Sequence, residues 1–180
     1  MRWLALAALL AIGGVARADG DRALSLGLGY ATFDVPGPAS HNQTPPDLSP
    51  DAGGALSVSY EHALSTDLSL RGEAAGGLFD GGNVKKEGAL SYAGLVDVGI
   101  AFRFDVLKYV PYAFAGVGGV VAGGGPIDVG AQPVLVIGGG LDWLQSRDRS
   151  YGVEGRLASF AGDVTVFTLG VRASVRWGYF

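Results

Sequence analysis

Apolar and polar side chains alternate strictly along the last segment of the chain, residues 164–180. Every second residue from Phe167 to Tyr179 is apolar, whereas the residues between them, including Arg172 and Arg176, are polar or glycine. A period of two places successive side chains on opposite faces of an extended chain. The pattern therefore predicts a β-strand with one apolar face and one polar face.

The same alternation recurs in seven earlier segments, so the sequence predicts eight strands in all. Val, Leu, Ile, Phe and Tyr recur on the apolar faces, and Ser, Gly and charged residues on the polar faces. The predicted strands span residues 22–33, 54–62, 67–79, 89–104, 110–122, 133–144, 151–160 and 164–180.

The links between these segments alternate in length. The links after the first, third and fifth strands are long and rich in Gly, Pro, Asn or Asp, whereas those after the second, fourth and sixth are short. Long loops at one end and tight turns at the other are typical of an outer-membrane barrel. We therefore predict an all-β fold, an eight-stranded antiparallel up-and-down transmembrane β-barrel with both termini at the tight-turn end. The long links are 34–53, 80–88 and 123–132, the short ones are 63–66, 105–109 and 145–150, and the seventh link is 161–163.

Charged residues on the polar faces indicate what fills this barrel. Five are acidic and five are arginines, and an ionised side chain facing lipid costs roughly 2–4 kcal/mol near the bilayer midplane, so we expect them to point inward. Eight strands enclose an interior that side chains just fill, and arginine binds carboxylates through paired hydrogen bonds. We predict a lumen plugged by ion pairs. The alternative is a lipocalin-like carrier, in which these charges form a solvated outer face around an apolar core. The predicted lumen charge network is Glu61, Arg71, Glu73, Asp97, Arg103, Asp142, Glu154, Arg156, Arg172 and Arg176.

Composition limits the chemistry that this chain can carry. Hydrophobic residues make up 48% and charged residues only 17% of the 180 residues. The chain has no cysteine, which excludes disulfides, thiol nucleophiles and cysteine-based metal sites. It has two histidines, His41 and His62, which is little material for an imidazole metal site. We predict no metal and no cofactor.

The first 18 residues have the pattern of a secretory signal peptide. Arg2 supplies the positive start, residues 4–12 form an apolar run, and Ala16-Arg17-Ala18 forms an A-x-A cleavage site before Asp19. We predict a signal peptide over residues 1–18 and a barrel domain over 19–180. Without Arg2 and Arg17, 11 basic residues face 17 acidic ones, a net charge near −6. That balance argues against a nucleic-acid partner.

The end of the chain resembles the closing strand of bacterial outer-membrane barrels. Trp177 and Tyr179 are residue types that lie where hydrocarbon meets water, and the chain ends on Phe180. In that family a terminal Phe is part of the signal read by the barrel-insertion machinery. The resemblance implies that Trp177, Tyr179 and Phe180 form this insertion signal. This chain departs from the family at Gly178, where an aromatic residue is usual.

Two further segments extend the resemblance over the mature chain. The run Y-V-P-Y-A-F-A-G-V-G at residues 109–118 and the run G-G-G-L-D-W at 138–143 resemble strands of the small barrels of the outer-membrane-protein-A type. Larger members carry a periplasmic peptidoglycan-binding domain after the barrel. This chain ends at strand eight, so we do not expect that tethering function. The resemblance implies a monomer in the lipid of a Gram-negative outer membrane, with both termini periplasmic.

Small relatives in this family are credited with surface adhesion, membrane integrity or lipid chemistry. We predict a non-enzymatic barrel with a structural or surface-interaction role. One alternative is an outer-leaflet lipid-modifying enzyme, because loop 34–53 holds Ser40, His41 and Asp47, the residue types of an activated hydroxyl nucleophile. Five prolines in that loop make it a poor holder for a triad. We expect His41 to be a solvated loop residue and His62 an interfacial one at the tight-turn end. A narrow solute channel is the third possibility.

Overall fold

The computed structural model describes residues 21–36, 47–82, 90–104, 108–160 and 164–178. The predicted signal peptide and the residues Ser40, His41, Tyr179 and Phe180 lie outside this part of the chain.

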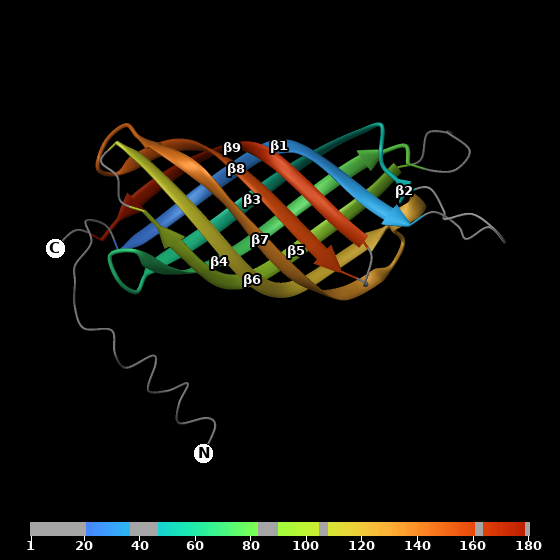
Figure 1. Cartoon of the computed structure of the whole chain (residues 1–180), viewed down its shortest axis with the longest axis horizontal. Coiled ribbons are helices and arrows are strands. Elements are labelled where there is room, and N and C mark those ends of the chain that lie inside the picture. The colour runs from blue at the N-terminus through green and yellow to red at the C-terminus, as the bar shows by residue number, and fades with distance from the viewer. Residues whose placement is uncertain (1–20, 37–46, 83–89, 105–107, 161–163, 179–180) are drawn as a thin grey trace, which may run out of the picture.

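The described residues form a closed antiparallel β-barrel (Figure 1). Each of the eight long strands pairs with its neighbours in sequence, and the first and last long strands pair with each other, which closes the cylinder. The predicted architecture is confirmed. The elements are β1 (Arg22–Pro36), β2 (Asp47–Leu48), β3 (Ala52–Ala63), β4 (Leu68–Asp80), β5 (Leu90–Arg103), β6 (Tyr109–Gly123), the 3₁₀-helix η1 (Gly125–Ile127), β7 (Gly130–Leu144), β8 (Arg149–Phe160) and β9 (Val164–Trp177).

Two links that we predicted to be irregular contain short structured pieces. The strand β2 pairs with the end of β1, where Val35 lies opposite Leu48. The helix η1 follows β6, and its Ile127 is completely buried. Alternation cannot predict these elements, because β2 has only two residues and η1 only three, which is too short to show a repeating pattern.

The outer wall of the barrel is apolar. Leu28 and Val171 face each other across the closing seam between β1 and β9, and both are about 60% exposed. Outward side chains on every long strand follow the same rule, because the closed sheet leaves one parity without a protein partner. None of the helices among the described residues is long and apolar enough to span a membrane.

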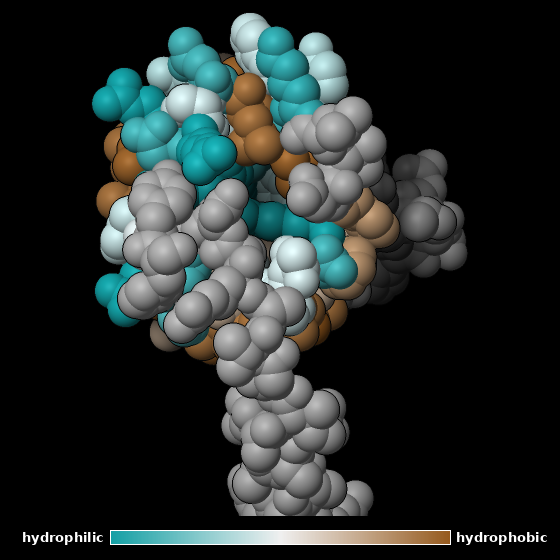
Figure 2. All heavy atoms as spheres, turned by 90° about the vertical axis from the view of Figure 1, so that its left-hand side faces the viewer, coloured by the Kyte–Doolittle hydropathy of each residue, from teal (hydrophilic) through white to brown (hydrophobic). Residues whose placement is uncertain are grey.

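Aromatic side chains gather at the tight-turn end of this wall. Tyr60 and Trp177 lie 6.3 Å apart between ring centroids, and Phe102 and Phe104 lie 4.9 Å apart. Trp143 lies under the ammonium group of Lys108 at 5.1 Å. Such rings favour the interface between hydrocarbon and water. In the view from this end (Figure 2), hydrophilic residues lie within the central hollow and on parts of its rim, and hydrophobic residues lie on the flanks.

Candidate functional site

The barrel interior is divided into two halves of different chemistry. Towards the tight turns and the middle, the inward side chains are charged or polar. Towards the long loops they are apolar, and Phe33, Phe79 and Phe160 are almost fully buried there. The residue pattern predicts only the charged side chains inside the barrel, so the apolar loop-side half is a finding of the structure.

Two ion pairs connect opposite walls of the charged half. The strands β4 and β8 are four positions apart around the eight-stranded cylinder, so they face each other across the lumen. Arg71 of β4 binds Glu154 of β8 at 3.0 Å, and Arg156 of β8 forms an ion pair with Glu73 of β4. Arg71 also binds Glu73 on its own strand at 2.5 Å. These contacts cross the full width of the barrel.

Arg172 of β9 is the centre of a second group of contacts. Its guanidinium donates to both oxygens of Asp142 at 3.0 and 2.9 Å and to Glu154 at 3.0 Å. It also lies over the ring of Tyr112, 4.3 Å from the centroid. The Tyr112 hydroxyl in turn donates to Glu154 at 2.8 Å. Every one of these partners is inside the barrel, where low polarity strengthens charge-assisted hydrogen bonds.

The remaining predicted residues lie nearer the tight turns. Arg103 binds Glu61 at 2.5 Å, and Arg176 binds Asp142 at 3.3 Å. Ser69 donates a hydrogen bond to Glu61 at 3.1 Å. Nine of the ten predicted lumen charges therefore take part in ion pairs.

Asp97 is the exception. It points inward and is only 6% exposed, yet no arginine in the described part of the chain lies within 4 Å of it. Its direct cross-strand neighbours are Glu73 on β4 and Gly118 on β6. Among the described residues, Asp97 therefore stands outside the ion pairs that join the other nine charges.

Two aromatic residues that are absent from the predicted charge network also belong to this group. Phe114 lies under the guanidinium of Arg71, 3.8 Å from the ring centroid, and Tyr112 lies under Arg172. Their position in the alternating pattern could have indicated this. Tyr112 and Phe114 share the inward face of β6 with Gly116 and Gly118, and these glycines leave space for large rings in a narrow barrel. Arginine stacked on a ring gains cation–π attraction in addition to its ion pairs.

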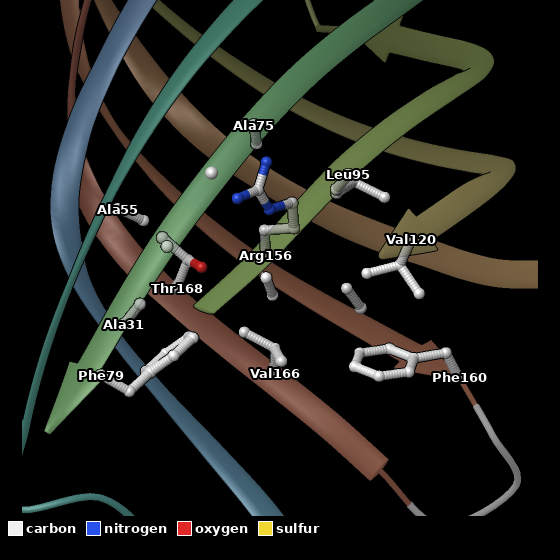
Figure 3. A pocket seen from close by; sticks show the side chains of 14 residues that line it. Ala31, Ala55, Ala75, Phe79, Leu95, Val120, Arg156, Phe160, Val166 and Thr168 are labelled. Carbon is white, nitrogen blue, oxygen red and sulfur yellow. The ribbon is translucent and has the colours of Figure 1, made fainter. Parts of the chain in front are cut away.

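The apolar half contains a small cavity of about 30 Å³. Figure 3 shows Arg156 and Ala75 on one side of it, and Phe79 and Phe160 on the other. Thr168 lies directly opposite Arg156 in the pairing of β8 with β9. Arg156 and Thr168 are therefore the polar groups where the charged half of the lumen meets the apolar half.

The other candidate residues are spread over the molecule. Trp177 of the predicted insertion signal faces outward at the end of β9. His62 is half-buried near the tight-turn end of β3, and Asp47 lies in β2 at the opposite end. Within the described residues, no group of three or more His, Asp or Glu side chains could hold a metal ion.

This closed cylinder is the fold of the small eight-stranded outer-membrane barrels, as comparison with solved structures shows. The attachment invasion locus protein Ail of Yersinia pestis matches with a TM-score of 0.54 and 18% identity, over 87% of this chain and 99% of that one. Neisserial surface protein A matches with a TM-score of 0.59 and 12% identity, over 87% and 97%. The outer membrane enzyme PagL matches with a TM-score of 0.52 and 15% identity, over 86% and 99%. No protein-family model and no curated protein sequence matches the chain.

Proposed function

We propose that the protein is an integral outer-membrane barrel with a non-enzymatic structural or surface-interaction role. The observation that carries this proposal is the distribution of polarity. The outer wall is apolar on every long strand, and the charged groups on the inner wall bind one another. This arrangement suits a cylinder surrounded by lipid and is unfavourable for one surrounded by water. After removal of a signal peptide near Ala18–Asp19, the barrel-insertion machinery would deliver the chain, as a monomer with both termini periplasmic.

We further propose that the ion pairs plug the lumen. Arg71–Glu154 and Arg156–Glu73 join opposite walls, so a hydrated ion would have to separate them to pass. Breaking a buried ion pair by displacing one partner costs about 3–5 kcal/mol. This cost opposes the opening of the lumen and supports a plug.

Recordings in planar bilayers test the plug. The folded full-length mature chain should give no steady single-channel current. The double variant Arg71→Ala/Arg156→Ala, which removes both cations that cross the lumen, should conduct if it folds. Steady current through the unmodified protein would refute the plug and favour the narrow-channel alternative.

Two further measurements test the location and the absence of catalysis. The mature protein should sediment with the outer-membrane fraction and migrate differently on a gel when folded and when boiled. Recovery of a soluble monomer without detergent would refute the membrane assignment. This chain has the same fold as the outer membrane enzyme PagL, so the catalytic alternative needs its own test. Replacing His41 with Ala should leave the lipid A composition of the cell unchanged.

A further inference from the structure

We propose that one face of the barrel, formed by β8, β9, β1 and β3, binds an anionic phospholipid. A groove on the outer wall would hold an acyl chain, and Arg22 and Arg149 at the tight-turn end would hold the phosphate. This inference rests on the proposed location in the outer membrane, and it assigns one class of lipid to one site there.

The groove lies over the seam that closes the barrel. Its four strands are neighbours around the cylinder, with β9 and β1 at the centre (Figure 1). Ala173 of β9 lies directly opposite Leu26 of β1 and Tyr151 of β8. Because its side chain is short, a groove of about 530 Å³ remains between these larger neighbours, within the ~300–1,000 Å³ that is usual for small-molecule sites. The other outward side chains that line it are Leu28, Leu56, Val58 and Val171.

Basic side chains lie at the tight-turn end of the same strands. Arg22 is the first residue of β1 and Arg149 the first residue of β8, and both share the outward parity of the groove residues. Their side chains are 50% and 66% exposed. His62 lies directly opposite Arg22 on β3. Arginine binds phosphate oxygens through paired hydrogen bonds, so this row of side chains suits an anionic headgroup.

Two aspartates lie beside these arginines and do not occupy them fully. The contacts Arg22–Asp21 and Arg149–Asp148 are each 3.8 Å long, which is beyond hydrogen-bond distance. Asp148 also accepts a hydrogen bond from the Ser146 hydroxyl at 2.6 Å. Exposed ion pairs of this kind contribute little, so both guanidinium groups keep donors for a phosphate.

The spacing between the cations and the groove fits one lipid molecule. Arg149 is two residues from Tyr151, and Arg22 is four residues from Leu26, which is about 7 and 13 Å along the strands. Strands tilted by ~35–45° reduce these separations to roughly 5 and 10 Å along the membrane normal. Each headgroup region of a bilayer is roughly 5–8 Å thick. A phosphate at the arginines therefore places the start of its acyl chain at the groove.

Paramagnetic broadening by a spin-labelled lipid measures the preference of this face. The mature full-length chain, with ¹³C-labelled Leu and Val methyl groups, is folded in phosphatidylcholine nanodiscs. Leu28 and Val171 report on the groove, where they lie opposite each other. Val98 and Val117 form the equivalent pair on the opposite wall, between β5 and β6. The probes are phosphatidylglycerol and phosphatidylcholine that carry the same nitroxide on the acyl chain.

The expected preference follows from the number of cations. One basic residue at the membrane surface favours an anionic lipid roughly fivefold, and the groove has two arginines. Spin-labelled phosphatidylglycerol should therefore broaden Leu28 and Val171 at a lipid fraction at least tenfold lower than spin-labelled phosphatidylcholine does. The opposite wall has Lys108 just before β6, so the preference at Val98 and Val117 should not exceed about fivefold.

Two variants separate the charge from the groove. Arg22→Gln should lower the preference at the groove about fivefold, whereas its control, Lys108→Gln, should leave it unchanged. Ala173→Leu fills the groove and retains both arginines, and it should lower the preference because the acyl chain can no longer lie against the wall. Its control is Ala115→Leu on the outer wall of β6, which should not. Folding of each variant is checked by the heat-dependent gel shift.

Three results would overturn the proposal. Equal preference at the two walls would mean that any cation at the interface suffices. An unchanged preference in Arg22→Gln or in Ala173→Leu would exclude the headgroup site or the groove. Broadening of Val98 and Val117 but not of Leu28 and Val171, by either lipid, would mean that protein, such as a second copy of the chain, covers this face. A chain that still folds in phosphatidylcholine retains its assignment as a membrane barrel in all three cases.

Discussion

Replacement of Arg172 by Gln should destabilise the barrel severely, because this residue has the largest number of buried polar contacts. It makes three charge-assisted hydrogen bonds, two to Asp142 and one to Glu154, of 2.9 to 3.0 Å. At about 1.5–3 kcal/mol each, a simple sum would reach about 5–9 kcal/mol. That sum is too large, because Asp142 keeps Arg176 at 3.3 Å and Glu154 keeps Arg71 at 3.0 Å. The acids left behind are only partly unpaired, so we expect a loss of about 3–5 kcal/mol.

Reversible urea unfolding in phospholipid vesicles measures this loss, with tryptophan fluorescence as the readout. The matched control is Arg149→Gln, because Arg149 is the exposed first residue of β8 and lies 3.8 Å from Asp148 of the preceding turn. Exposed ion pairs contribute little to stability, so the control should unfold at the same urea concentration as the unmodified protein. If Arg172→Gln costs less than about 1 kcal/mol, the lumen contacts do not stabilise the barrel as we argue.

Three other predictions concern the wall, the seams and a turn. Gly118→Ala should prevent folding, because a Cβ there would overlap a backbone carbonyl of β5. Its control, Gly94→Ala, adds a Cβ in open space and should fold. The gel shift of folded protein distinguishes the two variants. Leu28→Arg should cost about 2–4 kcal/mol in vesicle unfolding, because the charge would face lipid near the middle of the wall, and no loss would contradict an outward lipid face. The Ser146 hydroxyl, 2.6 Å from Asp148, holds the pKa of that carboxyl below its ordinary value. Ser146→Ala should raise this pKa in a ¹³C titration, so that Asp148 takes up its proton at higher pH, and an unchanged midpoint would exclude the hydrogen bond as the cause.

The strands could be predicted from the sequence because successive side chains point to opposite sides of the barrel wall, and the two sides require different residue types. Outward positions such as Leu28 and Val171 are exposed on the outer wall, and inward positions such as Arg172 meet other side chains. The observed strand bounds differ from the predicted ones by no more than three residues, including the last strand, which ends at Trp177. The clearest difference is at the start of β7, which begins at Gly130 and includes Pro133, a residue that we took as the first of its strand.

The contacts inside the barrel could not be predicted in the same way. Which acid meets Arg156 depends on the stagger of all eight strands around the cylinder, and alternation within one strand carries no information on that. The apolar half was missed because the pattern assigns the inward parity to polar and small residues, whereas Phe33, Phe79 and Phe160 are apolar residues on that parity near the strand ends. The same limit applies to Asp97, because its parity predicts an inward side chain but not which arginine, if any, lies within reach.

The central claim is that the apolar outer wall of the barrel faces lipid, and a spin label tests it directly. The chain contains no cysteine, so Val171→Cys and Asp148→Cys each give a single labelling site without other changes. In vesicles, a nitroxide at position 171 should collide often with dissolved oxygen and rarely with a water-soluble nickel complex, whereas a nitroxide at position 148 should collide readily with the nickel complex. Equal access of the nickel complex to both positions would contradict a barrel whose outer wall faces lipid.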